Sequence, residues 1–399
     1  MVHSHTVIVL GLYFPGIDIL RDFKKRGIQC IGMDCYAREP GFSLKRTSTF
    51  VCPDPESHQE EWLEFIMQFR GTNGKKPVLL ITSDKFVLPV LKYSEKLSEV
   101  FLFHHSYENA TEKLMSKQGL VLAAQRSGVP VAKTIFYKKG NDFLDEIGEL
   151  KYPCLIRPSY GKKWWEDPLK TIVHGHKLIR VENASEVEGW LSKILPYDDE
   201  LMIQEMIPGP DKNLFYLVIY MTKDQRCLGY FCGQKLRITP IHFGSASYMK
   251  TVNAAPVLDS ALKILKDNKY WGPAGVEFKK DDDTGDFKLV EINTRFGLWD
   301  VMGAKLGVDI FYQAYLDLTG MQVQQLTPLD IDYKWLSITR DVRTYIDYHR
   351  EKSLSTFSWL KSYFGRVYYA DIYLTEPKLM YTLYLRKLFR YLTRNRSSK

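Results

Sequence analysis

Carboxylate, amide and guanidinium side chains recur at strand spacing between residues 274 and 298. Glu291, Asn293 and Arg295 are each two positions apart, so in a β-strand their side chains project from the same face. Glu277 lies upstream in a second apolar run, AGVEF. The Asp- and Gly-rich segment DDDTGD separates this run from FKLVEIN, and this arrangement predicts a β-hairpin with Ile292 turned to the core.

These side chains indicate a site for a divalent metal. Two carboxylates and one amide oxygen form the all-oxygen ligand set that Mg²⁺ prefers when it also bridges substrate phosphates. We therefore predict that Mg²⁺ is bound by Glu277, Glu291 and Asn293. Arg295 is expected to hold an anion beside the metal. Because a Glu-x-Asn pattern alone also occurs by accident in solvated hairpins, the prediction depends on the whole set.

Several segments resemble the ATP-grasp family. The end of that fold, whose members use an E-x-N-x-R strand to hold Mg²⁺ on ATP, is similar to GPAGVEFK, KLVEINTRFG and GAKLGVDIFYQAYLDLTG. The adenine and ribose segment of the family resembles LMIQEMIPGPDKNLF, its phosphate-binding strand resembles YPCLIRPSYG, and its entry resembles MSKQGLVLAAQRSGVPVAKT. A likeness to the D-aspartate ligase type of carboxylate-amine ligase is carried by QKLRITPIHFGSASYMKTV and WWEDPLKTIVHGHK. The resemblance covers most of the chain up to about Gly320.

The resemblance implies which residues bind ATP. ATP and a carboxylate substrate repel each other, so cations must converge on them from several segments. The cations that match the family positions are Lys117, Arg157, Lys177, Lys235 and Arg237. Gln204, Glu205 and Ile207 are expected to line the adenine pocket. Asp211 is expected to form hydrogen bonds with the ribose hydroxyls. Catalytic roles in steadying the transferred phosphoryl group and the oxyanion fall to Lys235, Arg237 and Arg295.

Arg157 departs from the family pattern, which usually has lysine there. Arginine keeps the charge, but its planar fork is longer and binds phosphate bidentately, so the exchange is not conservative. Lys162 and Lys163 follow and could compensate, although GKKWW is bulkier than the family's glycine-rich loop. These departures leave a second interpretation open, a catalytically impaired ATP-binding protein with a regulatory or scaffolding role at the membrane.

The resemblance implies an ADP-forming reaction that makes a C–N bond. A substrate carboxylate attacks the γ-phosphate of ATP, and an amine then displaces phosphate from the acyl phosphate. ATP and Mg²⁺ are the expected cofactors, and the substrates are a small-molecule or precursor-linked carboxylate and an amine, with an amino acid as the amine. The expected product is a modified cell-envelope or polysaccharide precursor.

Length and composition fit an α/β protein of several units. The chain has 399 residues, of which 45% are hydrophobic and 14% aromatic, as expected for globular domains with real cores. We predict an ATP-grasp fold preceded by a Rossmann-like parallel-sheet pre-domain at 1–107. The ATP-grasp domain is expected at 108–322, with lobes at about 108–199 and 200–322. A C-terminal extension that is rich in aromatic and basic residues follows at 323–399.

The pre-domain begins with a strand, helix and strand pattern in TVIVLGL, IDILRDFKKRG and IQCIGMD. Gly11, Gly16 and Asp34 raise a dinucleotide-binding alternative, but the Gly-x-x-x-x-Gly spacing lacks the close glycine pair that approaches pyrophosphate. After the strand in VLLITSDKF, polar groups at the sheet's carboxyl end are expected to serve the substrate site or to cap the next helix, namely Thr82, Ser83 and Asp84.

The C-terminal segment is basic and amphipathic from Lys378 onward. Such a helix can lie on an anionic membrane surface, or it can dock on the protein with a solvated basic face. This tail contributes much of the net charge of +8, and no DNA or RNA motif accompanies it, so we expect no nucleic-acid partner. The six scattered cysteines lack metal spacing and favour a reduced, cytosolic protein. If the tail helix binds a membrane, the protein is expected to be peripheral at its inner face. A homodimer is compatible with this sequence.

Overall fold

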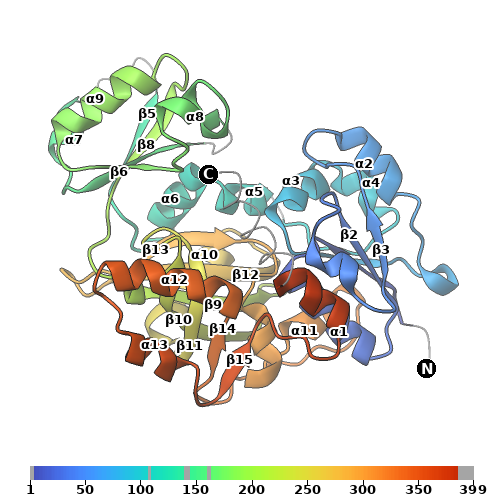
Figure 1. Cartoon of the computed structure of the whole chain (residues 1–399). Coiled ribbons are helices and arrows are strands. Elements are labelled where there is room, and N and C mark those ends of the chain that lie inside the picture. The colour runs from blue at the N-terminus through green and yellow to red at the C-terminus, as the bar shows by residue number, and fades with distance from the viewer. Residues whose placement is uncertain (1–3, 107–108, 139–143, 160–162, 385–399) are drawn as a thin grey trace, which may run out of the picture.

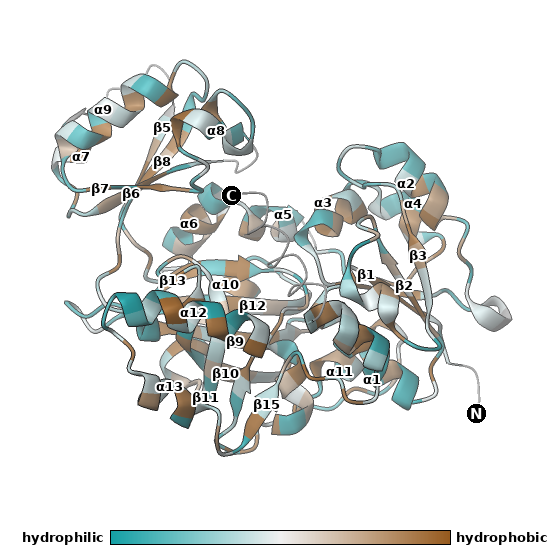
Figure 2. Ribbon diagram, in the orientation of Figure 1, coloured by the Kyte–Doolittle hydropathy of each residue, from teal (hydrophilic) through white to brown (hydrophobic). Residues whose placement is uncertain are grey.

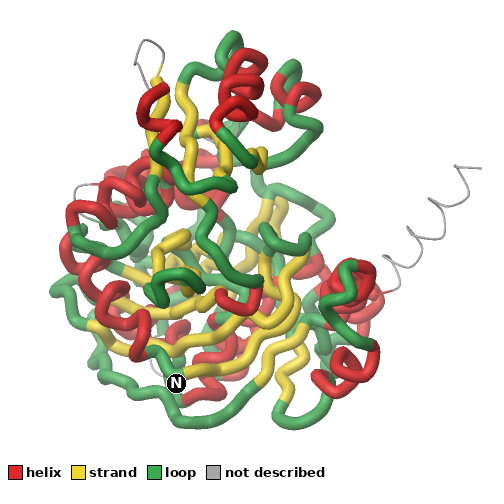
Figure 3. The backbone as a smooth tube through the Cα atoms, turned by 90° about the vertical axis from the view of Figure 1, so that its left-hand side faces the viewer, coloured by secondary structure: helices red, strands yellow, loops and turns green. Residues whose placement is uncertain are grey.

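Three β-sheets organise the part of the chain that the computed structural model describes, residues 4–106, 109–138, 144–159 and 163–384. A parallel sheet near the N-terminus is followed by a small antiparallel sheet and by a larger, mainly antiparallel sheet. Figure 1 shows the small sheet standing away from the other two, and the view in Figure 3, turned by 90°, keeps it above the larger sheet.

The N-terminal sheet has short apolar strands that alternate with helices, and its strands pair in parallel in the order β3-β2-β1-β4. The strands are β1 (Val7–Leu10), β2 (Cys30–Asp34), β3 (Ser48–Val51) and β4 (Val78–Ile81). The helices are α1 (Phe14–Lys25), α2 (Gln59–Ile66), α3 (Asp84–Lys92) and α4 (Ser94–Ser98), with short 3-10 turns η1 (Pro40–Ser43) and η2 (Thr72–Gly74). The predicted parallel sheet is confirmed.

Gly11 and Gly16 serve close packing at the carboxyl end of this sheet. A Cβ atom at Gly16 would lie 2.0 Å from the carbonyl oxygen of Gly11, and Gly11 itself has a φ of +102°. The hydroxyl of Thr82 donates to the carbonyl oxygens of Leu10 and Gly11 at 3.1 and 2.9 Å. Gly16 therefore lets the start of α1 lie against Gly11, and Gly11 lets the loop after β1 pack against Thr82 and Ser83 after β4. Both glycines have a structural role other than cradling pyrophosphate.

The small antiparallel sheet forms the first lobe, with strand order β5-β8-β6-β7. Its strands are β5 (Thr134–Lys138), β6 (Cys154–Pro158), β7 (Ile179–Val181) and β8 (Glu200–Glu205). The helices that pack on this sheet are α7 (Leu144–Gly148), α8 (Leu169–Ile172) and α9 (Ala184–Ile194), with η4 (Lys163–Trp165). Helices α5 (Ala110–Met115) and α6 (Lys117–Arg126), which precede it in the chain, pack instead in a core of the larger sheet. Since β8 pairs with both β5 and β6, residues 200–205 belong to the first lobe, a few residues beyond the boundary that we predicted near residue 200.

The larger sheet has the order β13-β12-β9-β10-β11-β14-β15. Its first five strands in the chain are β9 (Leu214–Met221), β10 (Cys227–Thr239), β11 (Ser245–Val252), β12 (Gly272–Lys280) and β13 (Phe287–Asn293). Alternate residues of β9 enter two different cores, Val218 on one face and Leu217 on the other. Helices α10 (Ala255–Asp267) and α11 (Ile310–Leu318) cover these opposite faces, and η5 (Asp211–Asn213) and η6 (Asp300–Leu306) lie in the connections.

The C-terminal extension continues the larger sheet. Strand β14 (Lys334–Leu336) pairs with β11, and β15 (Val367–Tyr369) pairs with β14. Between them lie α12 (Ile338–Arg350) and α13 (Thr356–Ser362), and residues 377–384 are helical. The extension is therefore part of the second lobe's sheet, and not only the helical appendage that the sequence suggested.

The basic tail helix packs on the body as far as the structure describes it. Leu379 and Leu383 are 0% and 3% exposed and join the core that contains α1 and α11. The basic residues of the tail from Arg386 onward lie outside the described residues. Within the described ranges, no helix is both long and apolar enough to cross a membrane.

Candidate functional site

A cavity of about 1720 Å³ opens between the two lobes and the pre-domain. It exceeds the volume of a typical small-ligand pocket, so it can hold a nucleotide together with a second substrate. Of the thirteen residues that the sequence singled out, it is lined by Lys117, Arg157, Lys177, Gln204, Glu205, Ile207, Asp211, Lys235, Glu277, Glu291, Asn293 and Arg295. Arg237 is the exception, and its different position has a local cause described below.

The hairpin expected from the sequence forms one wall of the cavity. Strands β12 and β13 pair antiparallel with Glu277 opposite Glu291, and Ile292 is 2% exposed in the core beneath. The turn is fixed by the carboxylate of Asp281, which accepts from the backbone N–H of Asp283 at 2.8 Å and pairs with Lys288 at 2.7 Å. Direct cross-strand pairing therefore holds the two glutamates side by side on the cavity face.

Each of the two glutamates is paired with a lysine from another element. Lys235 on β10 forms an ion pair with Glu277, and both side chains are at least 90% buried. Lys117, the first residue of α6, places its Nζ 2.6 Å from Oε1 of Glu291. The positive charge of Lys117 lowers the pKa of Glu291 to about 2, so this carboxylate is ionised near neutral pH.

The hairpin residues fit a magnesium site that is completed by substrate. Glu277 and Glu291 supply carboxylate oxygens, and Asn293 adds an amide oxygen on the same face, which accepts from Arg295 Nη2 at 3.4 Å. Within the described ranges, no three His, Cys, Asp or Glu side chains converge as a metal cage. Mg²⁺ in proteins commonly takes one or two carboxylates together with waters and phosphate oxygens.

Arg295 joins the second lobe to the pre-domain. Its Nε and Nη2 each donate at 2.8 Å to the carboxylate of Asp84, the first residue of α3. Its Nη1 donates to the carbonyl oxygen of Phe296 at 3.1 Å. The residue expected to hold an anion is thus paired with a pre-domain carboxylate, which ties two of the cavity's walls together. Of the three polar residues singled out at the carboxyl end of the parallel sheet, Asp84 lines the cavity, whereas Thr82 and Ser83 do not. The Ser83 side chain makes no capping hydrogen bond either.

Arg157 projects from β6 of the first lobe into the cavity. Its Nη2 donates to Oε1 of Gln204, whose amide nitrogen in turn donates to Thr134 Oγ1 at 2.7 Å. Its Nε is buried without a hydrogen-bond partner, and burial lowers the pKa of the guanidinium. A buried donor without a partner is costly, so an anionic ligand at this position would be favoured.

The two lysines that follow Arg157 were considered as compensating cations. Lys163 pairs with Asp198 at 3.1 Å, and Lys162 lies outside the described residues.

The predicted adenine segment forms part of the connection between the lobes. The Glu205 carboxylate accepts from the backbone N–H of Lys151 at 2.8 Å. The carbonyl oxygen of Ile207 accepts from Lys279 Nζ at 2.7 Å. Both residues line the cavity, and Lys177 reaches it from an exposed bend before β7.

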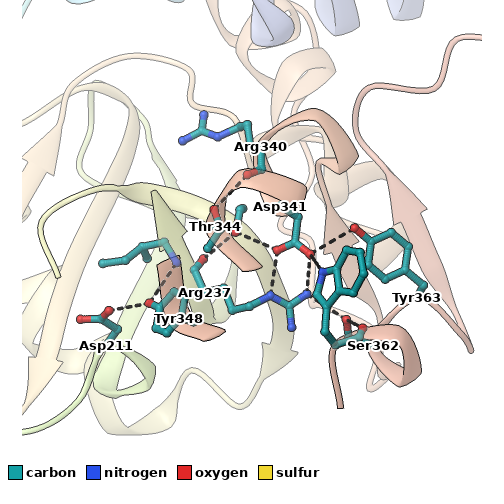
Figure 4. A network of polar contacts seen from close by, with 11 residues as sticks. Asp211, Arg237, Arg340, Asp341, Thr344, Tyr348, Ser362 and Tyr363 are labelled. Atoms are coloured by element: carbon teal, nitrogen blue, oxygen red, sulfur yellow. Dashed lines mark hydrogen bonds and ion pairs between the residues drawn. The ribbon is translucent and has the colours of Figure 1, made fainter. Parts of the chain in front are cut away.

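Asp211 is held by residues that the sequence did not single out. Its Oδ2 accepts from Tyr348 Oη at 2.5 Å and from the backbone N–H of His242 at 3.1 Å. Tyr348 belongs to α12, so the C-terminal extension supplies a wall of the cavity, together with Glu351 and Ser353. Figure 4 shows Tyr348 pointing toward Asp211. The two residues are 137 positions apart, and no local motif could have indicated the contact.

Arg237 lies in a buried ion pair away from the cavity lining (Figure 4). Its Nε and Nη2 each donate at 2.8 Å to the carboxylate of Asp341 on α12. The predicted catalytic role does not fit this position. The cause is local, because an irregularity in the β10–β11 pairing between Lys235 and Arg237 adds a residue, Leu236, and reverses which face the next side chain takes.

Two further cavity residues were missed. Lys279 follows Glu277 by two positions on β12, so the period-two pattern that selected the hairpin residues would have found it. Tyr216 pairs across strands with Glu277 and is buried, which raises the pKa of its hydroxyl well above the ordinary value. A Cβ atom at Gly275 would lie 1.8 Å from its Oη, so that glycine is required for the tyrosine to fit.

Comparisons with known proteins agree with this geometry. No protein-family model matches the chain. The N5-carboxyaminoimidazole synthetase of Staphylococcus aureus, solved in complex with ADP, superposes with a TM-score of 0.65 at 15% identity, covering 88% of this chain and 87% of that one. The L-amino acid ligase of Bacillus licheniformis gives 0.57 at 14% identity, covering 80% and 75%. The chain has the ATP-grasp fold.

One curated protein is similar to this chain in amino-acid sequence. The D-aspartate ligase of Enterococcus faecium (strain Aus0004) is 23% identical over 248 residues, which make up 60% of this chain. The chain spans 58% of the length of that relative. The ATP-grasp resemblance drawn from the hairpin and the upstream segments is therefore confirmed.

Proposed function

We propose that this ATP-grasp chain is an ATP-dependent carboxylate-amine ligase that acts through an acyl phosphate. The observation that carries the proposal is the pair of facing glutamates, Glu277 and Glu291, each matched by a lysine at the inter-lobe cavity. Neighbouring carboxylates and lysines suit a magnesium–polyphosphate ligand. The carboxylates can bind the metal cation, and the lysines can bind the phosphate anions. The likeness to a D-aspartate ligase supports the reaction class.

The hairpin would hold the metal through Glu277, Glu291 and Asn293. Mg²⁺ held there would supply positive charge to the phosphates of ATP. When Glu291 and Glu277 bind the metal, their lysine partners become available to phosphate oxygens. These partners are Lys117 of α6 and Lys235 of β10. Arg157 adds its unpartnered Nε from the first lobe, so cations approach the polyphosphate from both lobes.

The chemistry divides into two displacements on the substrates. A carboxylate oxygen attacks the γ-phosphorus, the bond to ADP breaks, and an acyl phosphate forms. The nitrogen of the amine then attacks the acyl carbon, phosphate leaves with the electron pair of the C–O bond, and the nitrogen loses a proton. Arg295 is the cation assigned to the oxyanion of this second step, and its bonds to Asp84 fix its place in the cavity wall.

The substrate class follows from the likeness to known ligases. An amino acid is the proposed amine, because the curated relative is named a D-aspartate ligase and a structural neighbour an L-amino acid ligase. The proposed carboxylate belongs to a precursor of the cell envelope or of a polysaccharide. The cavity has room for such a second substrate beside ATP.

The test is ADP release in the presence of Mg²⁺-ATP, a panel of amino acids and a panel of carboxylates. A ligase releases ADP and phosphate only when a productive pair is present, and Glu291→Gln abolishes most of that release. Glu99→Gln, on an exposed helix end of the pre-domain, is the matched control. A chain that binds ATP tightly but releases no ADP with any pair would instead be the impaired ATP-binding protein.

A further inference from the structure

Helix α13 turns large apolar side chains to the solvent. Phe357, Leu360 and Phe364 are 77%, 50% and 72% exposed, although most surface helices direct such residues inward. Phe357 and Leu360 are three positions apart on one side of α13, and Phe364 follows in the bend after the helix ends at Ser362. These three residues are called the apolar stripe. Figure 2 shows this hydrophobic colouring on α13 at the lower edge of the molecule, on the side away from the first lobe.

The inward face of α13 is polar and fixes the orientation of the helix. Trp359 Nε1 donates to the Asp341 carboxylate at 2.8 Å, and Tyr363 Oη donates to the same group at 3.2 Å. Ser362 Oγ accepts from Arg237 at 2.8 Å (Figure 4). Because these bonds determine which face is buried, rotation of α13 cannot hide the apolar stripe.

Basic residues flank this stripe in the sequence. Between residues 347 and 366 the basic residues are Arg350, Lys352, Lys361 and Arg366, all exposed, against two acidic residues, Glu351 and Asp347, of which Asp347 lies 3.9 Å from Arg350. Glu351 pairs with His242 at the rim of the cavity. The surface formed by Phe357, Leu360 and Phe364 with these four cations is called the α13 surface below. It combines exposed apolar side chains with exposed cations.

We propose that the α13 surface docks on a membrane that carries anionic lipids. An anionic bilayer attracts the four cations and accepts the three apolar side chains at the level of its headgroups. The segment beyond Tyr384 adds six basic residues and no acidic one, so charge repulsion disfavours that tail as the occupant, and a second copy of the α13 surface is disfavoured for the same reason.

The inference is independent of the proposed ligase reaction. The α13 surface contains no residue that we assign to metal, nucleotide or substrate. Its failure would leave the ligase proposal standing, and a chain without ligase activity could still dock.

The experiment is co-sedimentation of the full-length chain with vesicles of phosphatidylglycerol and phosphatidylcholine, compared with vesicles of phosphatidylcholine alone. The triple variant Phe357→Ser, Leu360→Ser, Phe364→Ser should bind the anionic vesicles roughly tenfold more weakly. Replacement of Lys352 and Lys361 by Gln should weaken binding by roughly fivefold per residue at low salt, and this difference should vanish at high salt. Circular dichroism of every variant verifies folding, and the charge variant decides the matter if the triple variant is unfolded.

The matched control is Phe50→Ser with Tyr197→Ser, which removes two aromatic residues of 40% and 53% exposure elsewhere on the surface. The control should bind as the unaltered chain does. The proposal is overturned if the unaltered chain ignores anionic vesicles, if it binds neutral vesicles equally well, or if folded α13 variants bind like the control. A variant with Arg386, Arg390 and Arg394 replaced by Gln shows whether the tail alone accounts for binding, which would also overturn it.

Discussion

Arg237 and Asp341 offer the sharpest contrast between two accounts of this chain, because one account makes Arg237 catalytic and the other structural. The structure buries the pair, with side chains 6% and 0% exposed, and joins the guanidinium to the carboxylate through two bonds of 2.8 Å. The Asp341 carboxylate also accepts from Ser247 Oγ at 2.9 Å and from Trp359 Nε1 at 2.8 Å. The pair therefore fastens α12 and α13 to strands β10 and β11.

Removal of one partner leaves the other charge buried without compensation. Breaking a buried pair in this way costs roughly 3 to 5 kcal/mol. Asp341→Ala should lie at the upper end, because it also deprives Ser247 and Trp359 of their acceptor at about 1 kcal/mol each. Arg237→Met should lie at the lower end, since Asp341 keeps its other donors. The double variant Arg237→Met, Asp341→Leu should lose less than the sum of the single losses, because it leaves no unpaired charge.

The assay is urea unfolding at pH 7, with ADP release measured per folded molecule. Arg38→Met, an exposed arginine of the pre-domain, is the control and should change the free energy of unfolding by about 0.5 kcal/mol or less. We expect Arg237→Met to keep most of its activity wherever it remains folded. An Arg237→Met protein with unaltered stability and ADP release lowered a hundredfold would refute the structural account and restore the catalytic one.

Three further predictions concern the cavity and its surroundings. Glu291→Gln removes one charge from the metal ligands and should lower ADP release by roughly a hundredfold or more, while thermal unfolding shows the same fold. Arg157→Ala should raise the Kd for ATP whereas Arg157→Lys retains much of the affinity; equal Kd values by calorimetry for all three proteins would remove Arg157 from the phosphate site. Burial raises the pKa of Asp300 to about 7, so its contribution to stability is complete below about pH 4 and is lost as the pH rises through 7. Asp300→Asn should therefore be more stable than the unaltered chain by up to about 4 kcal/mol at pH 8 and equal to it at pH 3.5, and urea unfolding at both values checks this.

Sequence patterns predicted those parts of the site that lie within a single hairpin or strand. The hairpin was predictable because period-two alternation and its turn residues agree, and the same alternation places Glu291 and Asn293 on one face with Ile292 beneath them. The parallel pre-domain sheet followed for the same reason. Predicting that Glu277 lies opposite Glu291 also requires the pairing register of β12 and β13, which the turn between them fixes.

Other features could not be predicted, because they depend on contacts between distant segments or on a single inserted residue. The bulge at Leu236 turns Arg237 away from the face of Lys235, and simple alternation gives the opposite result. Tyr348 reaches Asp211 from an extension whose strands were not expected to join the sheet. The Arg295 bonds to Asp84 depend on how the pre-domain lies against the second lobe.

The proposal of a ligase is tested most directly by the fate of carboxylate oxygen. Once the ADP assay has identified a productive pair, the carboxylate is labelled with ¹⁸O and the released phosphate is examined by ³¹P NMR. Transfer through an acyl phosphate moves one carboxylate oxygen into phosphate, so we predict phosphate that carries one ¹⁸O atom, in step with amide formation and dependent on Glu291. Unlabelled phosphate released with the amide would contradict the mechanism, because the carboxylate would then never have attacked ATP.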